Sequence, residues 1–561
     1  MDQLDEKTLA AIKRLEEDIL RDGRVDKAET EILLNFARPL AATDKEMAEF
    51  VRALEEVRED GVVTGDESFK IAAHLRWLVR ERGPTAPDTG LLGKLFKLGS
   101  NRTNVRTEVV AGVTTFMTMA YILAVNPNIL SMAGIPRGGV FVATAVAAVV
   151  GTLLMAFMSN YPFVLAPGMG LNAFLTFGVV LGMGYSWQFA LLAVFVEGLV
   201  FLALSLTPVR EGIFNAIPFS LKKAVAAGIG LFICLIAMKT AGIIVDNQAT
   251  LVSMVRFTDV PFCTHGICAV LALAGTILTG FMLVKGLKGA ILFGILATWV
   301  LGMVAQAAGI YIPDPAAGFF SLYPDFSVKG IADNFREFGS TFGALFNPEG
   351  WTLTKDGAIV RSGWELARTL DFFVVMFAFF FVDLFDTLGT LIGVSMKGGF
   401  LDKEGKLPRI SGALCADSIA TSVGAVFGTS TTTTFVESAS GVMAGGKTGL
   451  TGVTSAVLFA IAIVFAPVFL AIPGFATSPA LIIVGYMMLS SCADVDWSDP
   501  RDAVPAFLAV AAMPFTYSIS DGIMFGVISY TIINALSGNF KRIHWIMYIL
   551  TVLFVAKYAL M

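Results

Sequence analysis

The 561-residue sequence predicts an all-α polytopic membrane protein with about fourteen spans, preceded by a soluble helical domain. Three observations predict this class. First, 55% of the residues are hydrophobic and only 15% are charged, whereas soluble domains carry about 25% charged residues. Second, residues 1–90 alone hold 14 of the 40 Lys/Arg and 21 of the 45 Asp/Glu. Third, apolar stretches of roughly 20 residues, the length that crosses a bilayer, recur from residue 98 onward.

The N-terminal segment, residues 1–83, is predicted to be a soluble acidic helical domain. Its apolar residues recur every three to four positions, which is the period of an amphipathic helix. The first such run is Leu9, Ile12, Leu15 and Ile19. Two Asp-Gly repeats, at Asp22 and Asp60, resemble half of a calcium-binding loop. Leu20 stands where the first loop needs an oxygen ligand, so we interpret both repeats as turns and expect no metal.

This helical pattern resembles the small TerB-like domain. Gly and Pro residues in the following segment, residues 84–97, indicate a linker. The remainder, residues 98–561, is predicted to be the transmembrane domain. The charged N-terminus has no apolar stretch of the kind found in a cleavable signal peptide, so the first span is expected to insert the protein.

The transmembrane domain contains fourteen candidate spans. They are expected at 108–131, 139–159, 165–184, 188–206, 217–243, 265–284, 289–310, 366–395, 410–427, 432–444, 449–470, 475–491, 502–519 and 522–538. Lys and Arg gather in alternate loops, which places the N-terminus in the cytoplasm by the positive-inside rule. The apolar stretch 543–560 is either a fifteenth span or an interfacial helix. The long loop 311–365 is expected outside, with an interfacial helix around Phe335–Phe346.

Two of these spans are interrupted by residues that do not favour a lipid-facing helix. Residues 165–184 open with LAPGMGLNAF, and residues 428–442 read GTSTTTTFVESASGV. Interrupted segments in corresponding positions of two halves indicate a transporter's binding site. Seven spans in each half would make the two repeats inverted. The β-branched Thr run at 431–434 favours a short strand that pairs with the extended start of the third span.

The polar residues at membrane depth form a small set. Asp383 and Asp386 lie three apart on the eighth span and therefore share a helix face, and Glu437 lies on the tenth span. Three mid-membrane carboxylates cost on the order of 8–10 kcal/mol in lipid, so they must face an interior. Because carboxylates there can take up and release a proton, we predict that these three couple transport to protons. For two further acids, Glu197 and Asp417, we favour a structural role.

Six motifs carry a family resemblance over residues 98–560. They are TMAYILAVNPNIL (118–130), LAPGMGLNAF (165–174), AVFVEGLVFLALSLTPVREGIFNAIPFSLKKAVAAGIGLF (193–232), VDLFDTLGTLIGV (382–394), GTSTTTTFVESASGVMAGGKTGLT (428–451) and SPALIIVGYMM (478–488). Together they resemble the AzgA-type adenine/guanine/hypoxanthine permeases, a branch of the nucleobase:cation symporter-2 (xanthine/uracil permease) family.

The resemblance implies two inverted seven-span repeats, in which spans 1–4 and 8–11 form a core domain and the others a gate domain. It implies a substrate site between the third and tenth spans. Asn172, Asp383 and Glu437 match substrate-contacting positions there, and Asp386 matches a further acid. Phe435 is an additional candidate, because its ring offers a flat face to a base. The implied function is import of purine bases by proton symport across the cell (inner or plasma) membrane, without a cofactor.

Several alternatives stay open. TMAY stands where the ascorbate/xanthine branch has a Gln-His pair, which favours purine bases over uracil or xanthine as substrate. A sulfate- or anion-type transporter of the same 7+7 fold is the main alternative, although the predicted site lacks a basic residue. A membrane sensor is another, and an enzyme is least expected, because no nucleophile–base pair appears. Expected partners are the lipid bilayer, a second copy in a homodimer and a regulator of the N-terminal domain; a net charge of −5 does not suit nucleic acid.

Overall fold

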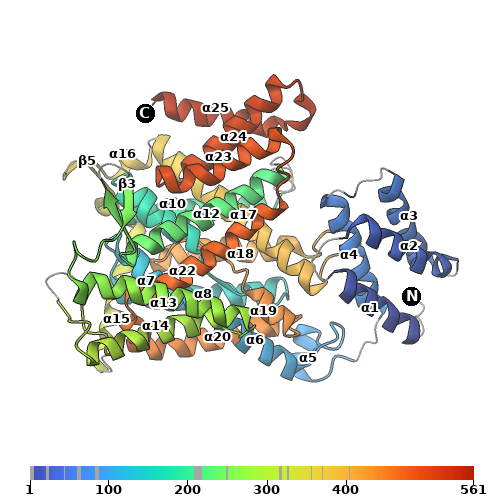
Figure 1. The fold of residues 1–561 in the computed structure, drawn as a ribbon, viewed down its shortest axis with the longest axis horizontal. Coiled ribbons are helices and arrows are strands. Elements are labelled where there is room, and N and C mark those ends of the chain that lie inside the picture. Colours follow the sequence, from blue (N-terminus) through green and yellow to red (C-terminus); the bar gives the residue numbers. More distant parts are fainter. Residues whose placement is uncertain are drawn as a thin grey trace.

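The computed structural model describes residues 6–560 except 21–24, 43, 60–62, 64, 83–86, 208–217, 248–250, 315–318, 325–327, 356, 369 and 404. It is helical almost throughout, and Figure 1 shows two parts, a small N-terminal bundle and a much larger helical body. Each part has a hydrophobic core of its own.

The N-terminal bundle consists of four helices. They are α1 (Glu6–Ile19), α2 (Lys27–Ala41), α3 (Lys45–Glu59) and α4 (Gly65–Arg82). Leu34 and Leu54 are fully buried between them. A capping box begins α2, in which the Asp26 side chain accepts from the Glu29 amide and the Glu29 side chain accepts from the Asp26 amide. The calcium-loop-like turns at 21–24 and 60–62 lie outside the described residues, and part of the predicted linker forms helix α5 (Gly90–Phe96).

The body is built from two halves with the same order of elements. The first half comprises α6 (Val105–Met119), α7 (Ile122–Ser131), α8 (Arg137–Met158), β1 (Leu165–Pro167), α9 (Met169–Ala173), the π-helix η1 (Phe174–Gly182), α10 (Trp187–Ser205), α12 (Phe219–Thr240), α13 (Ile267–Val284) and α14 (Ala290–Ala307). The second half comprises α17 (Leu370–Gly398), α18 (Ile410–Phe427), β6 (Thr432–Thr434), α19 (Ser438–Met443), α20 (Gly449–Ala462), α21 (Ala466–Ala471), α22 (Gly474–Leu489), α23 (Pro500–Thr516) and α24 (Ile519–Leu536). In each half, a short strand and a short helix follow the second span.

Helices or half-helices occupy all fourteen predicted spans. Within the described part of the chain, ten helices are long and apolar enough to cross a membrane, and two shorter apolar helices cover Met169–Gly182 and Gly474–Leu489. The predicted class, an all-α polytopic membrane protein, is therefore confirmed, whereas the number of fourteen spans stays a prediction. The last apolar stretch forms α25 (Trp545–Leu560).

The loop between the two halves contains α15 (Val328–Thr341), which overlaps the expected interfacial helix. Its Glu337 carboxylate accepts from the amides of Gly138 (2.7 Å) and Gly139 (3.2 Å). These amides belong to the first turn of α8, where backbone donors lack intrahelical partners and a negative charge is favourable. The contact therefore fixes α15 against the body.

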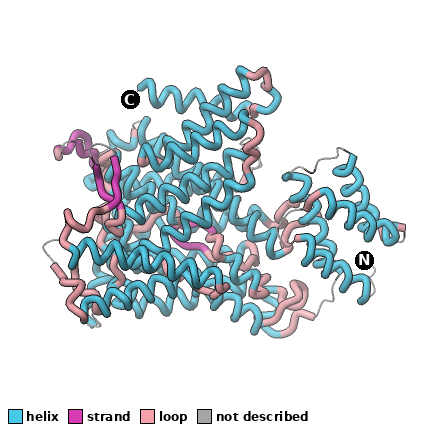
Figure 2. Tube along the Cα trace, in the orientation of Figure 1, coloured by secondary structure: helices cyan, strands magenta, loops and turns pink. Residues whose placement is uncertain are grey.

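The two interrupted spans meet in the interior, as the sequence predicts. Strands β1 and β6 pair antiparallel, with Leu165 opposite Thr434, and Figure 2 shows this short strand pair among the helices. The Gly168 amide extends the ladder by donating to the Thr431 carbonyl (2.9 Å). All strand residues are buried. Each broken segment thus satisfies backbone groups of the other, which irregular chain requires at membrane depth.

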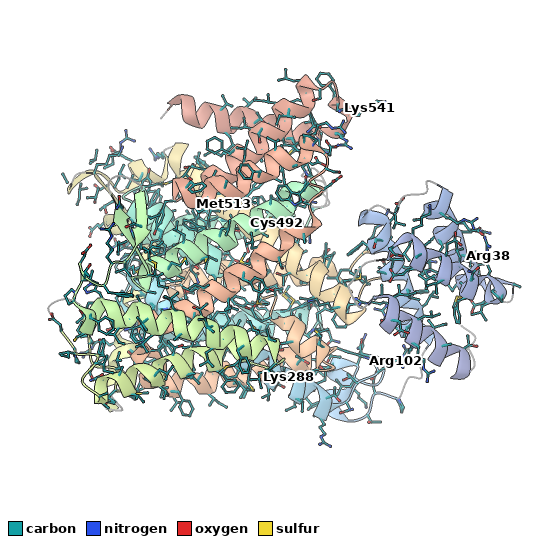
Figure 3. The ribbon with its side chains drawn as sticks, in the orientation of Figure 1. Arg38, Arg102, Lys288, Cys492, Met513 and Lys541 are labelled. Carbon is teal, nitrogen blue, oxygen red and sulfur yellow. The ribbon has the colours of Figure 1, made fainter. Side chains whose placement is uncertain are left out.

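Glycines allow close packing among the helices that follow the interrupted spans. A Cβ on Gly230 of α12 would lie 2.6 Å from the Gly485 carbonyl oxygen of α22. Met513 of α23, labelled in Figure 3, is fully buried, and a Cβ on Gly228 would lie 2.6 Å from its sulfur. Such small residues let helix backbones approach closely, as they do at helix interfaces in membranes.

Candidate functional site

Five carboxylates gather around the β1–β6 strand pair in the centre of the body. Asp383 and Asp386 come from α17, Asp417 from α18, Glu197 from α10, and Glu437 directly precedes α19. The side chains of Asp383, Asp417 and Glu197 are fully buried. The structure therefore brings together acids that are as much as 240 residues apart in the sequence.

Threonine hydroxyls organise one group of these acids. The Thr387 hydroxyl lies 2.7 Å from Asp417 Oδ2, 3.3 Å from Asp383 Oδ1 and 2.6 Å from the Thr433 hydroxyl. Because one hydroxyl has a single proton, the shorter carboxylate contact identifies Asp417 as its acceptor, and the Thr433 hydroxyl of β6 lies against both Thr387 and Asp383. Thr434 Oγ1 donates to Asp417 Oδ1 at 2.9 Å. Strand β6 is thus tied directly to the acids of α17 and α18.

Glu197 completes this first group. Its carboxyl group lies against that of Asp383 and interacts with Asp417. Among the described residues, no amide or hydroxyl donor reaches either oxygen of Glu197. Two carboxylates in contact repel each other unless a proton or a cation lies between them. The geometry of this pair is therefore suited to holding one proton.

A second group forms around Glu437. The Tyr121 hydroxyl donates to Glu437 Oε1 at 2.6 Å, and the Tyr121 side chain is fully buried. Asp386 interacts electrostatically with both residues. A Cβ on Gly168, at the start of the half-helix α9, would lie 3.8 Å from Asp386 Oδ2. The carboxylate that shares this region with Glu437 is therefore Asp386, whereas Asp383 belongs with Glu197 and Asp417.

Asn172 connects the two interrupted spans. Its side chain is fully buried, its Oδ1 accepts from the Ser430 hydroxyl, and its Nδ2 donates to the Pro167 carbonyl at 3.4 Å. Phe435 is buried directly after β6, and its amide donates to the Val164 carbonyl at 3.0 Å. Asn172 and Phe435, two of the predicted substrate-contacting residues, thus lie at the strand pair.

The sequence analysis did not name Tyr121 and favoured a structural role for Glu197 and Asp417; the structure places all three beside the predicted site acids. The signal for Tyr121 was present in the TMAY motif, which stands where the ascorbate/xanthine branch has a Gln-His pair. An acid in an apolar run was also a signal for Glu197, but a single sequence does not show which acids of distant helices meet. No group of three or more His, Cys, Asp and Glu side chains within the described chain is arranged to hold a metal ion.

Asp383, Asp417 and Glu197 are fully buried, whereas Asp386 and Glu437 are partly exposed. A cavity of about 660 Å³ lies elsewhere, near the start of α8 and of α22, and its lining includes Asn128, Arg137 and Phe475 but none of the five carboxylates.

Comparison with known proteins identifies a matching family model and several similar permeases. The family model Xan_ur_permease, described as "Permease family", matches residues 106–525. The guanine/hypoxanthine permease PbuO of Bacillus subtilis is 41% identical over 464 residues, which are 82% of this chain and 98% of that protein. The adenine permease AdeQ of Escherichia coli is 37% identical over 471 residues, which are 84% of this chain and 96% of that protein.

Solved structures share the fold. The transmembrane domain of the cyanobacterial bicarbonate transporter BicA superposes with a TM-score of 0.53 at 14% identity, covering 75% of this chain and 97% of that domain. At this identity the likeness concerns the arrangement of the helices and carries no information on the substrate.

Proposed function

The chain belongs to the Xan_ur_permease family, and on that premise we propose that it imports purine nucleobases by proton symport. The relatives named as adenine and guanine/hypoxanthine permeases support the purine class. The observation that supports the proposal is the pairing of β1 with β6. Asn172 follows β1 and Glu437 follows β6, and Asp386 lies near Gly168 at the start of α9.

The chemistry of these residues suits a purine edge. A purine base presents N–H donors beside ring-nitrogen acceptors, so its recognition requires both kinds of group. Glu437 is an acceptor only, and Tyr121 occupies one of its two oxygens, which leaves the other for a base N–H. Asn172 offers both a donor and an acceptor. Phe435 adds an aromatic ring against which a flat heterocycle can stack.

The proton is assigned to the neighbouring acids. Glu197 and Asp383 lie against each other, and the hydroxyl donors to Asp417 are neutral threonines. A proton shared between Glu197 and Asp383 relieves their repulsion when the site is closed. Strand β6 joins this group to Glu437, so a change at either place is transmitted through one short strand.

The strand pair is buried between helices, so exposing it to both sides requires a movement of those helices. We propose that spans 1–4 and 8–11 move as a core against the remaining spans and thereby expose the strand pair to each side in turn. An anion such as sulfate is the alternative cargo, but the described site residues are acidic or neutral, which disfavours an anion.

Uptake of labelled bases tests the proposal. Cells that lack their own purine permeases should accumulate labelled adenine, guanine or hypoxanthine when they express this protein, and a protonophore should abolish accumulation. Uptake driven by a sodium gradient alone would contradict proton coupling. Competition by sulfate but not by adenine would contradict the purine assignment.

Two conservative variants test the site. We expect Glu437→Gln to lower purine uptake by about 10- to 100-fold, since it removes a hydrogen bond to a charged group. Asp383→Asn should retain purine binding but lose dependence on the proton gradient. Surface labelling should show both variants in the membrane at wild-type levels. Wild-type kinetics in both variants would refute the site assignment.

A further inference from the structure

The N-terminal bundle contacts the body at the last turn of α17 and the segment that follows it, residues 396–406 without residue 404 (Figure 1). Helix α4 contributes Arg76 and Arg80 to this contact, and helix α3 contributes Glu46 and Glu49. The contacted residues lie at the end of the helix that carries Asp383 and Asp386 and just after it. The contact therefore links a soluble bundle to the helix that holds two acids of the proposed site.

The arginines complete the C-terminal end of α17. That end is a Schellman motif, in which the Phe400 amide donates to the Ser395 carbonyl (2.9 Å) and Gly399 adopts a positive φ of +64°. Arg76 donates to the Met396 carbonyl, and Arg80 donates to the Gly399 carbonyl at 2.8 Å. Carbonyls at a helix C-terminus lack helical partners and carry partial negative charge. The guanidinium groups of α4 thus add hydrogen-bond donors and positive charge at the C-terminal end of α17.

Lys403 makes the second half of the contact. It forms ion pairs with Glu49 and, at 3.5 Å, with Glu46. Its Nζ also lies 5.9 Å from the centre of the Trp77 ring. The turn that presents Lys403 is closed by a hydrogen bond from the Asp402 amide to the Lys406 carbonyl (2.8 Å). The contact therefore pairs the positive charge of Lys403 with two negative charges on α3.

The relatives indicate that transport does not require this bundle. PbuO and AdeQ are matched over 98% and 96% of their own lengths by 82–84% of this chain. The unmatched 16–18% of this chain is close in length to the segment before the first span, and the family model begins only at residue 106. A part that named permeases lack is better suited to adjusting transport than to performing it.

We propose that the N-terminal bundle is an intramolecular brace, which docks on residues 396–406 and restrains the inner end of α17. Because α17 carries Asp383 and Asp386, a restrained α17 slows the rearrangement of the helices that surround these acids. Release of the bundle then raises the rate of transport. This role rests on the proposed transport function, whereas the docking itself does not.

Charge reversal in the full-length protein tests the brace. We expect Lys403→Glu to accelerate hydrogen–deuterium exchange in residues 396–406 and to raise the maximal rate of labelled-adenine uptake by about two- to fivefold, the range of a surface ion pair. Adding Glu49→Lys to Lys403→Glu should return both quantities toward wild type. Arg52→Glu changes the charge of the exposed face of α3 by the same amount and should alter neither.

The two measurements separate the possible failures. Unchanged exchange in Lys403→Glu would refute the docking contact, whether or not the protein carries purines. Faster exchange with unchanged or slower uptake would refute the brace while the docking stands. Failure of the double variant to restore exchange would show that the charge pair does not hold the bundle. Absence of purine uptake in the wild type would instead refute the transport function.

Discussion

At the scale of single residues, buried acids in this protein differ in how many donors surround them. Glu108 is fully buried, but its carboxylate accepts from the amides of Thr448 and Thr451 and from both of their hydroxyls. Such a carboxylate is saturated and serves to hold the start of α20. Glu197 is equally buried and lacks such donors among the described residues. A functional role is therefore expected for Glu197, whose carboxyl group lacks such hydrogen-bond donors, rather than for Glu108.

The Tyr121–Glu437 hydrogen bond provides a prediction at this scale. Tyr121→Phe keeps the ring and removes the hydroxyl that orients Glu437, so the KM for purine should rise about tenfold while the maximal rate changes less. Kinetics of labelled-base uptake measure both constants.

Tyr311→Phe is the matched control for this variant. It removes a tyrosine hydroxyl that donates to the Phe320 carbonyl at 2.8 Å, away from the acids, and should leave the KM unchanged. An unaltered KM in Tyr121→Phe would show that Glu437 is held by other contacts.

At the scale of elements, close helix approach decides which acids meet. Helices α10 and α18 carry Glu197 and Asp417, and Gly198 lies where they touch. A Cβ on Gly198 would lie 2.9 Å from the Ser422 amide nitrogen and 3.1 Å from the Ser418 carbonyl oxygen. Backbone atoms cannot move aside as a flexible side chain can. The absence of a side chain at this position therefore permits the carboxyl groups to approach.

We accordingly expect Gly198→Ala to separate α10 from α18 and to lower the free energy of unfolding by about 1–3 kcal/mol. Thermal unfolding of the detergent-solubilised protein measures the loss, and purine uptake should fall with it. Gly280→Ala in α13 is the control, because its Cβ would have no neighbour within 4 Å and alanine favours a helix. Equal stability of the two variants would contradict close packing at Gly198.

At the scale of the whole molecule, the N-terminal bundle adds a response to pH outside the membrane domain. His74 lies between Phe50 and Trp77, with ring-centre distances of 5.0 and 5.9 Å. Burial and, to a smaller extent, the Lys403 ammonium together lower the pKa of His74 to about 4, against the opposing effect of the Glu49 carboxylate. The folded bundle therefore holds this histidine neutral, whereas the unfolded chain protonates it near pH 6.5.

Acidification should consequently destabilise the bundle between pH 6.5 and 4, because the unfolded state binds the proton first. The expected loss at pH 5 is about 2 kcal/mol. Hydrogen–deuterium exchange in α4, corrected for intrinsic rates, should be faster at pH 5 than at pH 7. His74→Phe, which keeps an aromatic ring, should remove the difference. A persistent difference in that variant would assign the acid sensitivity to other groups.

The sequence by itself determined the membrane class, the interrupted third and tenth spans and the pairing of their extended stretches, which β1 and β6 confirm. Hydrophobic length and β-branched runs are local properties, and local properties can be read along a chain. The same holds for the list of intramembrane acids, since an acid in an apolar run needs no partner to be noticed.

Only the tertiary structure decided how those acids are grouped. Asp383 and Asp386 lie three residues apart on one helix, yet the Asp383 carboxyl group lies against that of Glu197, while Asp386 interacts electrostatically with Glu437, Tyr121 and Asp417. Tyr121 and Glu437 are 316 residues apart, and Arg76 caps a helix end 320 residues later. Such contacts depend on the packing of whole helices, to which every residue along their length contributes. For that reason the sequence identified the intramembrane acids, but it did not show which residues each of them contacts.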